Sequence, residues 1–186
     1  MPYSLNLLGA ATLQGSAGPL KGPAAQRHRI ALLAFLAAHH PRPVSRGKAA
    51  ALLWPESDEE HARALLNQSV HTLRRALGEM AIGSGQQGLE FRSDAVGCDL
   101  VDFRQTLNSG ELEKAVRIHA GPFLDGFFLD DSTEFERWVD GERRRVTDDW
   151  VEAMETLACE AERRGDPSDA VRWWRALAAH DPPDSR

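Results

Sequence analysis

The sequence predicts a mainly α-helical fold with a small amount of β structure, divided into two domains. Apolar residues recur at helical spacing through most of the chain, and short apolar segments beside Gly-rich turns occur ahead of residue 97. Charge also divides the chain. Residues 1–96 hold ten Lys and Arg against seven Asp and Glu, a net charge of +3, whereas residues 97–186 hold twelve against twenty-one, a net charge of −9. The first domain could therefore approach DNA, and the second is better suited to protein partners.

Composition limits the class of protein. With 186 residues, 42% hydrophobic and 27% charged, the chain is long enough for one or two globular domains and too mixed to be disordered. No apolar run approaches the roughly 18 residues of a membrane span, and the first residues lack the features of a signal peptide, so we expect a cytoplasmic protein without membrane contact. Cys98 and Cys159 lie in no metal-binding pattern. We expect no metal, cofactor or disulfide, and both cysteines packed as small hydrophobes.

The N-terminal segment predicts a small antiparallel sheet followed by a core helix. Residues 4–8 and 11–13 are short strand candidates, and GSAG at residues 15–18 supplies a turn. Pro23 suits the first position of a helix that carries Ile30, Leu33 and Leu36 at helical spacing and ends before Pro41. This helix should be largely buried.

Two further helices in close succession predict a helix-turn-helix. Ser45 is a good N-cap for a helix from Arg46 to about Trp54, and WPESD at residues 54–58 links it to a helix over residues 58–77. Residues within an arc of about 80° form an apolar stripe on this second helix: Ala62, Leu66, Val70, Leu73 and Leu77, with Leu65, Ser69 and Ala76 at the margin.

The opposite face of the helix over residues 58–77 carries hydrogen-bonding side chains, and those with a charge are all basic. Its members are Arg63, Asn67, Gln68, His71, Thr72, Arg74 and Arg75, with no carboxylate between Arg63 and Leu77. Such groups read base edges and hold phosphates. A solvated helix face is the alternative, although a typical solvated face mixes charges of both signs.

A β-hairpin is predicted directly after this helix. Gly78 is a natural C-cap, and apolar residues 80–82 and 89–91 flank the Gly-rich segment GSGQQG at residues 83–88. Two short strands after an exposed polar helix are typical of the wing in a winged helix-turn-helix. A flexible linker is the alternative.

The second domain is predicted to be helical almost throughout. Short helices are expected around Leu100–Leu107 and Leu112–Ile118, and a long one over about residues 133–164. The apolar side of this long helix holds Phe135, Trp138, Val139, Val146, Trp150, Met154, Leu157 and Ala161. Gly165-Asp166-Pro167 breaks this helix, and Ser168 could cap a last one. The helix pair, closed by Asp181-Pro182, resembles tetratricopeptide repeats, and more repeats could follow the C-terminus in a longer protein.

Catalysis is not expected. The acidic pairs Asp130-Asp131 and Asp148-Asp149 lack partner ligands, and adjacent helical residues point about 100° apart, so they suit a solvated surface. No Ser-His-Asp spacing, phosphate-binding loop or dinucleotide motif occurs.

Seven segments together resemble the antibiotic-regulatory-protein (SARP) family of bacterial transcription activators. They are LNLLG at residues 5–9, RIALLAFLAAH at 29–39, PVSRGKAAALLWP at 43–55, LRRALG at 73–78, SDAVGCDLVDF at 93–103, GELEKAVRIHAGPFLDGF at 110–127 and EFERWVDGERRR at 134–145. Their order and spacing make the likeness specific. The resemblance implies a winged helix-turn-helix over residues 1–96 and a tetratricopeptide-like bacterial transcriptional activator domain over residues 97–186.

The resemblance also implies how double-stranded DNA would be held. The expected base contacts are Asn67, Gln68 and His71, and the expected phosphate contacts are Ser45, Arg46, Lys48, Arg63, Thr72, Arg74, Arg75 and Arg92. Ser45, Arg46 and Lys48 stand at a helix N-terminus, which favours an anion. The wing tip has Gln86 and Gln87 where relatives often place a basic residue, and Arg92 lies just beyond the second strand.

RNA polymerase or its sigma factor is the implied protein partner. The expected contact residues are Trp54, Glu56, Asp58 and Glu59 in the acidic turn before the recognition helix. Their alternative role is to complement the helix dipole.

The resemblance implies two protomers in tandem on promoter direct repeats, with Phe123, Phe127 and Phe128 as a candidate seam or, alternatively, as core residues. A protein-interaction or sensory module of a larger regulator, with a winged helix not used for DNA, is the alternative function.

Overall fold

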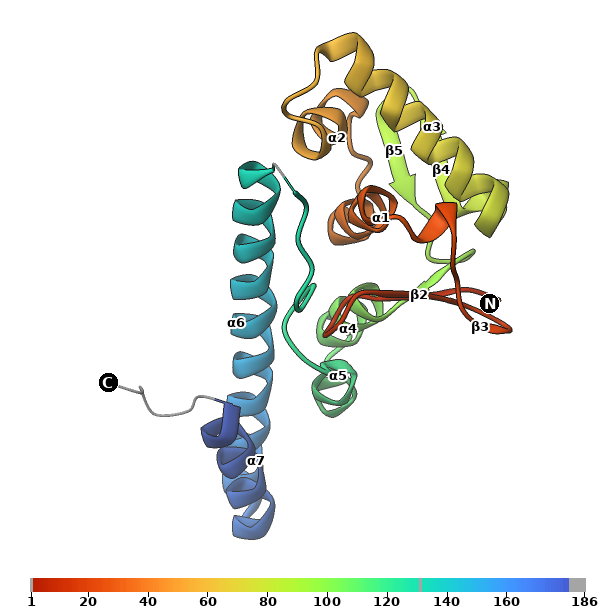
Figure 1. Cartoon of the computed structure of the whole chain (residues 1–186). Helices are drawn as coiled ribbons and strands as arrows, with labels where there is room; N and C mark the ends of the chain where they lie inside the picture. The colour runs from red at the N-terminus through yellow and green to blue at the C-terminus, as the bar shows by residue number, and fades with distance from the viewer. Residues whose placement is uncertain (1, 131, 181–186) are drawn as a thin grey trace.

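The computed structural model describes residues 2–130 and 132–180 and has the expected mainly helical architecture with little β structure (Figure 1). Asp131 and the Asp181-Pro182 pair lie outside these residues. Strands β1 (Ser4–Asn6), β2 (Thr12–Gly15), β3 (Gly18–Pro19) and β6 (Gly97–Cys98) form one sheet in the order β3-β2-β1-β6. The antiparallel pairing of β1 with β2 was predicted, and the parallel pairing of β6 with β1 was not.

Strand β6 ties the start of the second half of the chain to the N-terminal sheet. Directly after it, the carboxylate of Asp99 accepts hydrogen bonds from the backbone N–H groups of Leu7 at 2.8 and 2.9 Å and Leu8 at 2.9 Å. Burial raises the pKa of this carboxyl group. The expected domain boundary between residues 96 and 97 therefore falls immediately before a strand that belongs to the N-terminal sheet.

The three helices of the expected helix-turn-helix are present. They are α1 (Arg27–His39), α2 (Arg46–Leu53) and α3 (Glu59–Leu77). The Ser45 hydroxyl caps α2 by accepting from Lys48 N at 3.2 Å, as predicted. The prediction that Pro23 begins the first long helix was wrong. Pro23 instead begins a separate 3-10 turn, Pro23–Ala25, and Gln26 has an extended backbone that separates this turn from α1.

The hairpin after α3 is an ordered wing. Its strands are β4 (Ile82–Gly85) and β5 (Gly88–Phe91), and the exposed residue Met80, which was predicted to lie in a strand, belongs to the 3-10 turn Glu79–Ala81. The N–H of Val44 donates to Leu89 O at 2.7 Å, and the N–H of Leu89 donates to Val44 O at 2.8 Å. A Cβ at Gly88 would lie 2.0 Å from Val44 O, so only glycine allows this approach. The wing is therefore fastened to the entrance of α2.

The second half consists of helices with a long connection. The helices are α4 (Asp99–Asn108), α5 (Leu112–Ile118), α6 (Thr133–Arg164) and α7 (Pro167–His180). Figure 1 shows α6 along one side of the molecule and α7 folded back against its far end. The prediction that Ser168 caps α7 was wrong, because Asp166 Oδ1 accepts from Asp169 N at 3.0 Å. No helix in residues 2–130 and 132–180 is long and apolar enough to cross a membrane.

One hydrophobic core connects the N-terminal sheet with α6. It runs from Leu5 to Met154 and includes an aromatic group in which Phe35 and Phe123 contact Trp138 edge-on, with ring centroids 5.1 and 5.7 Å apart. Phe123 is thus a core residue, Phe127 is partly buried and Phe128 is exposed.

The two cysteines differ in their environment. The packed position predicted for both holds for Cys98, where burial raises the pKa of the thiol to about 12. It is wrong for Cys159, which is exposed on α6.

Candidate nucleic-acid interface

The polar face of α3 is open to solvent, and its apolar stripe is buried. Asn67, Gln68, His71, Arg63 and Arg75 are exposed, whereas Thr72 and Arg74 are half-buried. The buried residues of the helix are Ala62, Leu66, Ser69, Val70, Leu73 and Leu77. The helical period therefore divides α3 into an anchoring side and an outward side, as the sequence predicted.

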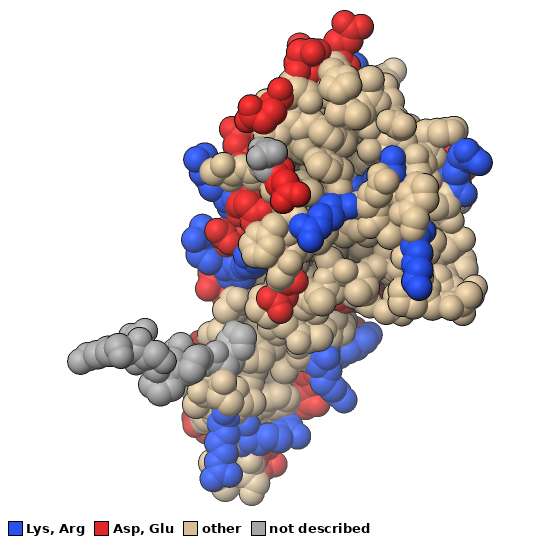
Figure 2. All heavy atoms as spheres, in the orientation of Figure 1, with Lys and Arg blue, Asp and Glu red and all other residues tan. Residues whose placement is uncertain are grey.

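Charge is distributed unevenly along α3. Figure 2 shows acidic side chains gathered at the upper end of the molecule, where α3 begins, and Lys and Arg side chains on the right, where α3 ends. Glu59 and Glu60 lie in the first turn of the helix, and Arg74 and Arg75 lie in the last. An anionic duplex would therefore be favoured along the middle and end of the helix and disfavoured at its start.

Arg46, Asn67, Ser84 and Arg74 form a polar network between the expected DNA-contacting elements. Arg46 Nη1 donates to Asn67 Oδ1 at 2.9 Å, and Arg46 Nη2 donates to Ser84 Oγ at 3.2 Å. Arg74 Nη2 donates to the same hydroxyl at 2.8 Å and to Ile82 O at 2.6 Å, while Arg74 Nε reaches Ile82 O at 3.0 Å. The start of α2, the face of α3 and the wing are therefore held in one arrangement.

No sequence pattern predicted a role for Ser84. A serine in a Gly-rich hairpin belongs to no helical or metal-binding pattern. The only indication in the sequence was its place in the Gly-rich segment that follows a helix rich in arginine. Because the network joins residues 21 and 38 positions apart in the chain, local spacing could not reveal it.

Several of the predicted phosphate contacts already have partners within the chain. Arg63 Nη2 lies 2.6 Å from Glu59 Oε1, and Lys48 Nζ lies 3.4 Å from His39 Nε2. Arg75 has no ion pair within the described part of the chain. The structure thus brings Arg46 to the polar face of α3 and to the wing, whereas Lys48 lies against His39 and Phe35 of α1.

Arg92 lies beside the wing, paired with a carboxylate. Its Nη2 is 3.0 Å from Asp94 Oδ2, and this hydrogen bond raises the pKa of the Arg92 guanidinium and lowers the pKa of Asp94. An exposed ion pair contributes little free energy, so a phosphate could displace Asp94.

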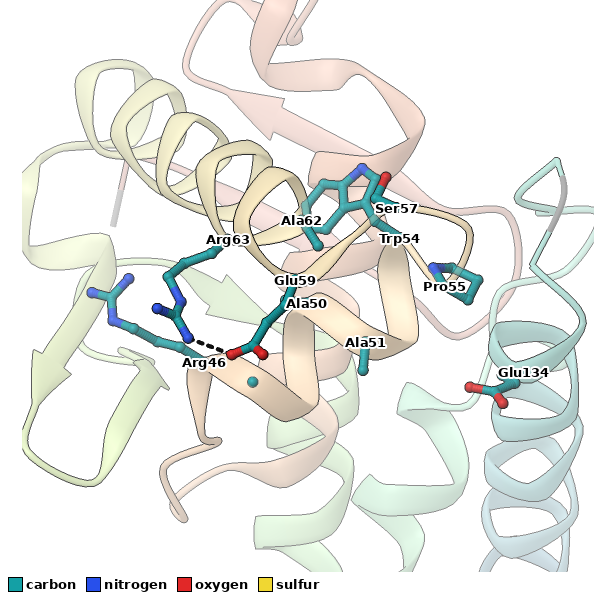
Figure 3. Close-up of a pocket in the computed structure, with 11 residues that line it drawn as sticks. Arg46, Ala50, Ala51, Trp54, Pro55, Ser57, Glu59, Ala62, Arg63 and Glu134 are labelled. Atoms are coloured by element: carbon teal, nitrogen blue, oxygen red, sulfur yellow. Dashed lines mark hydrogen bonds and ion pairs between the residues drawn. The ribbon is translucent and has the colours of Figure 1, made fainter.

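The acidic turn before α3 borders a hollow of about 330 Å³ between α2, α3 and the first turn of α6 (Figure 3). Apolar atoms of Ala50, Trp54 and Ala62 line part of it, and Glu134 approaches from α6. Trp54 stacks on His28 with ring centroids 5.4 Å apart, and burial lowers the pKa of this imidazole.

The predicted polymerase contacts differ in what they do within the chain. Asp58 Oδ1 accepts from His61 N at 2.9 Å and so caps α3, and Glu59 pairs with Arg63. The helix-terminus role is thus present for Asp58. Glu56 is exposed in the turn between the two helices.

The arrangement offers hydrogen-bond donors and acceptors. The described residues contain no group of three or more His, Cys, Asp and Glu side chains able to hold a metal ion.

Comparison with known proteins identifies a fold. No protein-family model matches the sequence, and no curated protein is similar enough to count as a relative. Among solved structures, EmbR of Mycobacterium tuberculosis, in complex with a low affinity phosphopeptide, is similar with a TM-score of 0.57 and 20% sequence identity. The match covers 98% of this chain and 61% of EmbR, so this chain spans less than two thirds of that protein. The likeness confirms the predicted fold class, a small N-terminal sheet and winged helix-turn-helix followed by a helical domain.

Proposed function

We propose that this chain is a sequence-specific DNA-binding transcription activator that acts in the cytoplasm. The observation that carries the proposal is the outward face of α3, where Asn67, Gln68 and His71 are exposed side by side on a helix whose opposite face is buried. Amides and imidazoles of this kind hydrogen-bond to base edges in the major groove. The resemblance of the seven sequence segments to the antibiotic-regulatory-protein family supports the same function.

The proposed complex places α3 in the major groove and the wing beside the adjacent backbone. Asn67, Gln68 and His71 face the bases, and phosphates are held from the helix, from the start of α2 and from the wing. The proposed phosphate contacts are Ser45, Arg46, Lys48, Arg63, Thr72, Arg74, Arg75 and Arg92. The second half, with its net charge of −9, stays away from the phosphates.

Selection of bound duplexes from random DNA tests this proposal. Two protomers in tandem require direct repeats about one helical turn apart, roughly 10 to 11 base pairs. Adding about five base pairs between the repeats should remove cooperative binding, because one half-site then faces the opposite side of the duplex. Equal cooperative binding to inverted repeats would contradict the tandem arrangement. Failure to recover any common sequence would favour an interaction or sensory module that does not use its winged helix for DNA.

Activation is proposed to use Trp54, Glu56, Asp58 and Glu59 as the contact with RNA polymerase or its sigma factor. These residues lie at the acidic end of α3, away from Arg75, so a polymerase subunit could bind there while DNA is held. The double substitution Glu56→Lys with Glu59→Lys should abolish transcription in a reconstituted assay, and DNA affinity should hold or rise. The matched control is Glu155→Lys, an exposed glutamate on α6, which should leave transcription unchanged. Unchanged transcript levels in the double variant would leave these carboxylates only their role at the helix terminus.

A further inference from the structure

The network around Ser84 constrains the side chain on which base recognition by α3 depends. Arg46 Nη1 lies 2.9 Å from Asn67 Oδ1, and the other terminal nitrogen of the same guanidinium lies 3.2 Å from Ser84 Oγ. In Figure 3 the Arg46 guanidinium extends away from the hollow beside Trp54. The guanidinium therefore lies on the side of the domain that is proposed to face DNA.

This contact determines which edge of the Asn67 amide is free. A guanidinium has only donors, so the amide atom that faces Arg46 has to be the oxygen. The amide nitrogen, with two donors, then points elsewhere, and no partner for it occurs within residues 2–130 and 132–180. Because Asn67 is exposed on the outward face of α3, this nitrogen is available to a base in the major groove.

The available edge favours one purine over the other. An asparagine that reads adenine uses both amide atoms, since Oδ1 accepts from N6 and Nδ2 donates to N7. Guanine presents two acceptors, N7 and O6, and needs only donors. Oδ1 keeps a second lone pair, but the guanidinium beside it carries only donors, which repel the amino group at N6 of adenine. The pair of side chains therefore presents a donor surface that matches guanine.

The wing holds this arrangement in place. Arg74 Nη2 lies 2.8 Å from Ser84 Oγ, and Arg74 also holds Ile82 O at 2.6 Å, so the hydroxyl that meets Arg46 is itself fixed to α3. The hydroxyl stands between two guanidinium groups and can accept from both. A change in the wing at Ser84 is thus transmitted through Arg46 to the reading face.

We propose that Arg46 and Ser84 are positioning residues that determine the base preference of Asn67, by holding its amide with Nδ2 toward DNA so that guanine is selected over adenine. The proposal rests on the proposed DNA-binding function and adds the identity of the base and the role of the wing. Arg46 acts through Asn67 in addition to any contact it makes with a phosphate.

The test uses the full chain and duplexes that differ only at the base read by Asn67. That base is located as the position where Asn67→Ala loses discrimination. The wild-type chain should prefer guanine over adenine there by about tenfold. Arg46→Lys keeps the positive charge but cannot bridge Asn67 and Ser84 at once, so the preference for guanine over adenine should fall below about threefold. Ser84→Ala, without any charge change, should reduce the preference about twofold.

A matched control and a DNA-free measurement separate positioning from phosphate binding. Arg42→Lys makes the same change at an exposed arginine on the turn between α1 and α2, and it should leave the preference intact. In the DNA-free protein, the side-chain amide resonances of Asn67 should shift in Arg46→Lys and in Ser84→Ala and stay unchanged in Arg42→Lys.

Three outcomes would overturn the inference or its basis. A wild-type preference for adenine over guanine contradicts the proposed orientation of the Asn67 amide, in which Nδ2 faces DNA. An Arg46→Lys variant with an unchanged guanine preference and unshifted Asn67 amide signals shows that Arg46 contacts only phosphate. A wild-type chain that selects no sequence at all refutes the proposed function itself, and this result is seen before any variant is tested.

Discussion

Helices α3 and α6 are both long and amphipathic, but they use their polar residues in opposite ways. From Arg63 onward α3 carries no carboxylate, and most of its polar side chains are exposed, the exceptions being the buried Ser69 and the half-buried Thr72 and Arg74. On α6, Glu142 is buried between Arg104 and Arg145, and Arg143 donates to Phe123 O and Leu124 O at 2.9 and 2.8 Å. Glu142 and Arg143 of α6 thus bind other parts of the chain. On α3, by contrast, the exposed side chains of Gln68, His71 and Arg75 have no hydrogen bond within residues 2–130 and 132–180. Burial and partners therefore determine the role of a charged residue.

Among the substitutions that test this difference between α6 and α3, Glu142→Gln should have the largest effect. Arg104 Nη2 lies 2.7 Å from Glu142 Oε2, and Arg104 Nη1 donates to Ala38 O at 2.6 Å, so the pair connects α4 and α6 with the end of α1. Glu142→Gln removes the charge and leaves a guanidinium that is only 26% exposed, which should lower the free energy of unfolding by about 3 kcal/mol. Denaturant titration measures the change.

The matched control is an exposed glutamate on the same helix. Glu155→Gln should change the free energy of unfolding by no more than about 0.5 kcal/mol. Equal stability of the two variants would show that the buried pair makes no net contribution to the free energy of unfolding. The charged residues of α6 would then matter no more for folding than the exposed residues of α3.

A smaller effect, on binding and not on folding, is expected from the face of α3. Asn67→Ala or Gln68→Ala should each cost roughly 1 to 3 kcal/mol on the preferred duplex and little on random DNA, because base contacts carry the sequence information. Both side chains are exposed, so the free energy of unfolding should stay close to that of the wild type. Equal losses on both duplexes would place the reading face elsewhere.

The features that sequence predicted best are those set by short-range rules. The apolar stripe of α3, the Ser45 cap and the hairpin of the wing follow from helical period, capping chemistry and turn residues. Strand β6 was missed because its two residues become a strand only by pairing with β1, more than ninety positions away.

In the candidate site, too, the sequence predicted what depends on local spacing and missed contacts between distant residues. The outward position of Asn67 and Gln68 followed from the helical period, but the partner of Asn67 is on another helix. Arg74 was predicted as a phosphate contact from its place on α3, and that role stays a prediction. Its hydrogen bonds to Ile82 O and Ser84 Oγ depend on how the wing folds back, which no local pattern encodes.

The salt dependence of DNA affinity shows whether α3 and its neighbouring cations bind a duplex. With about 4 to 6 cations at phosphates per protomer, log affinity should fall against log salt concentration with a slope on the order of −4 to −5. Arg75→Ala removes a cation with no ion pair in the described chain, so it should weaken binding to every duplex and reduce that slope by about 1. An affinity that does not change between low and physiological salt, or no binding to any duplex, would contradict the assignment of α3 as a DNA-reading helix.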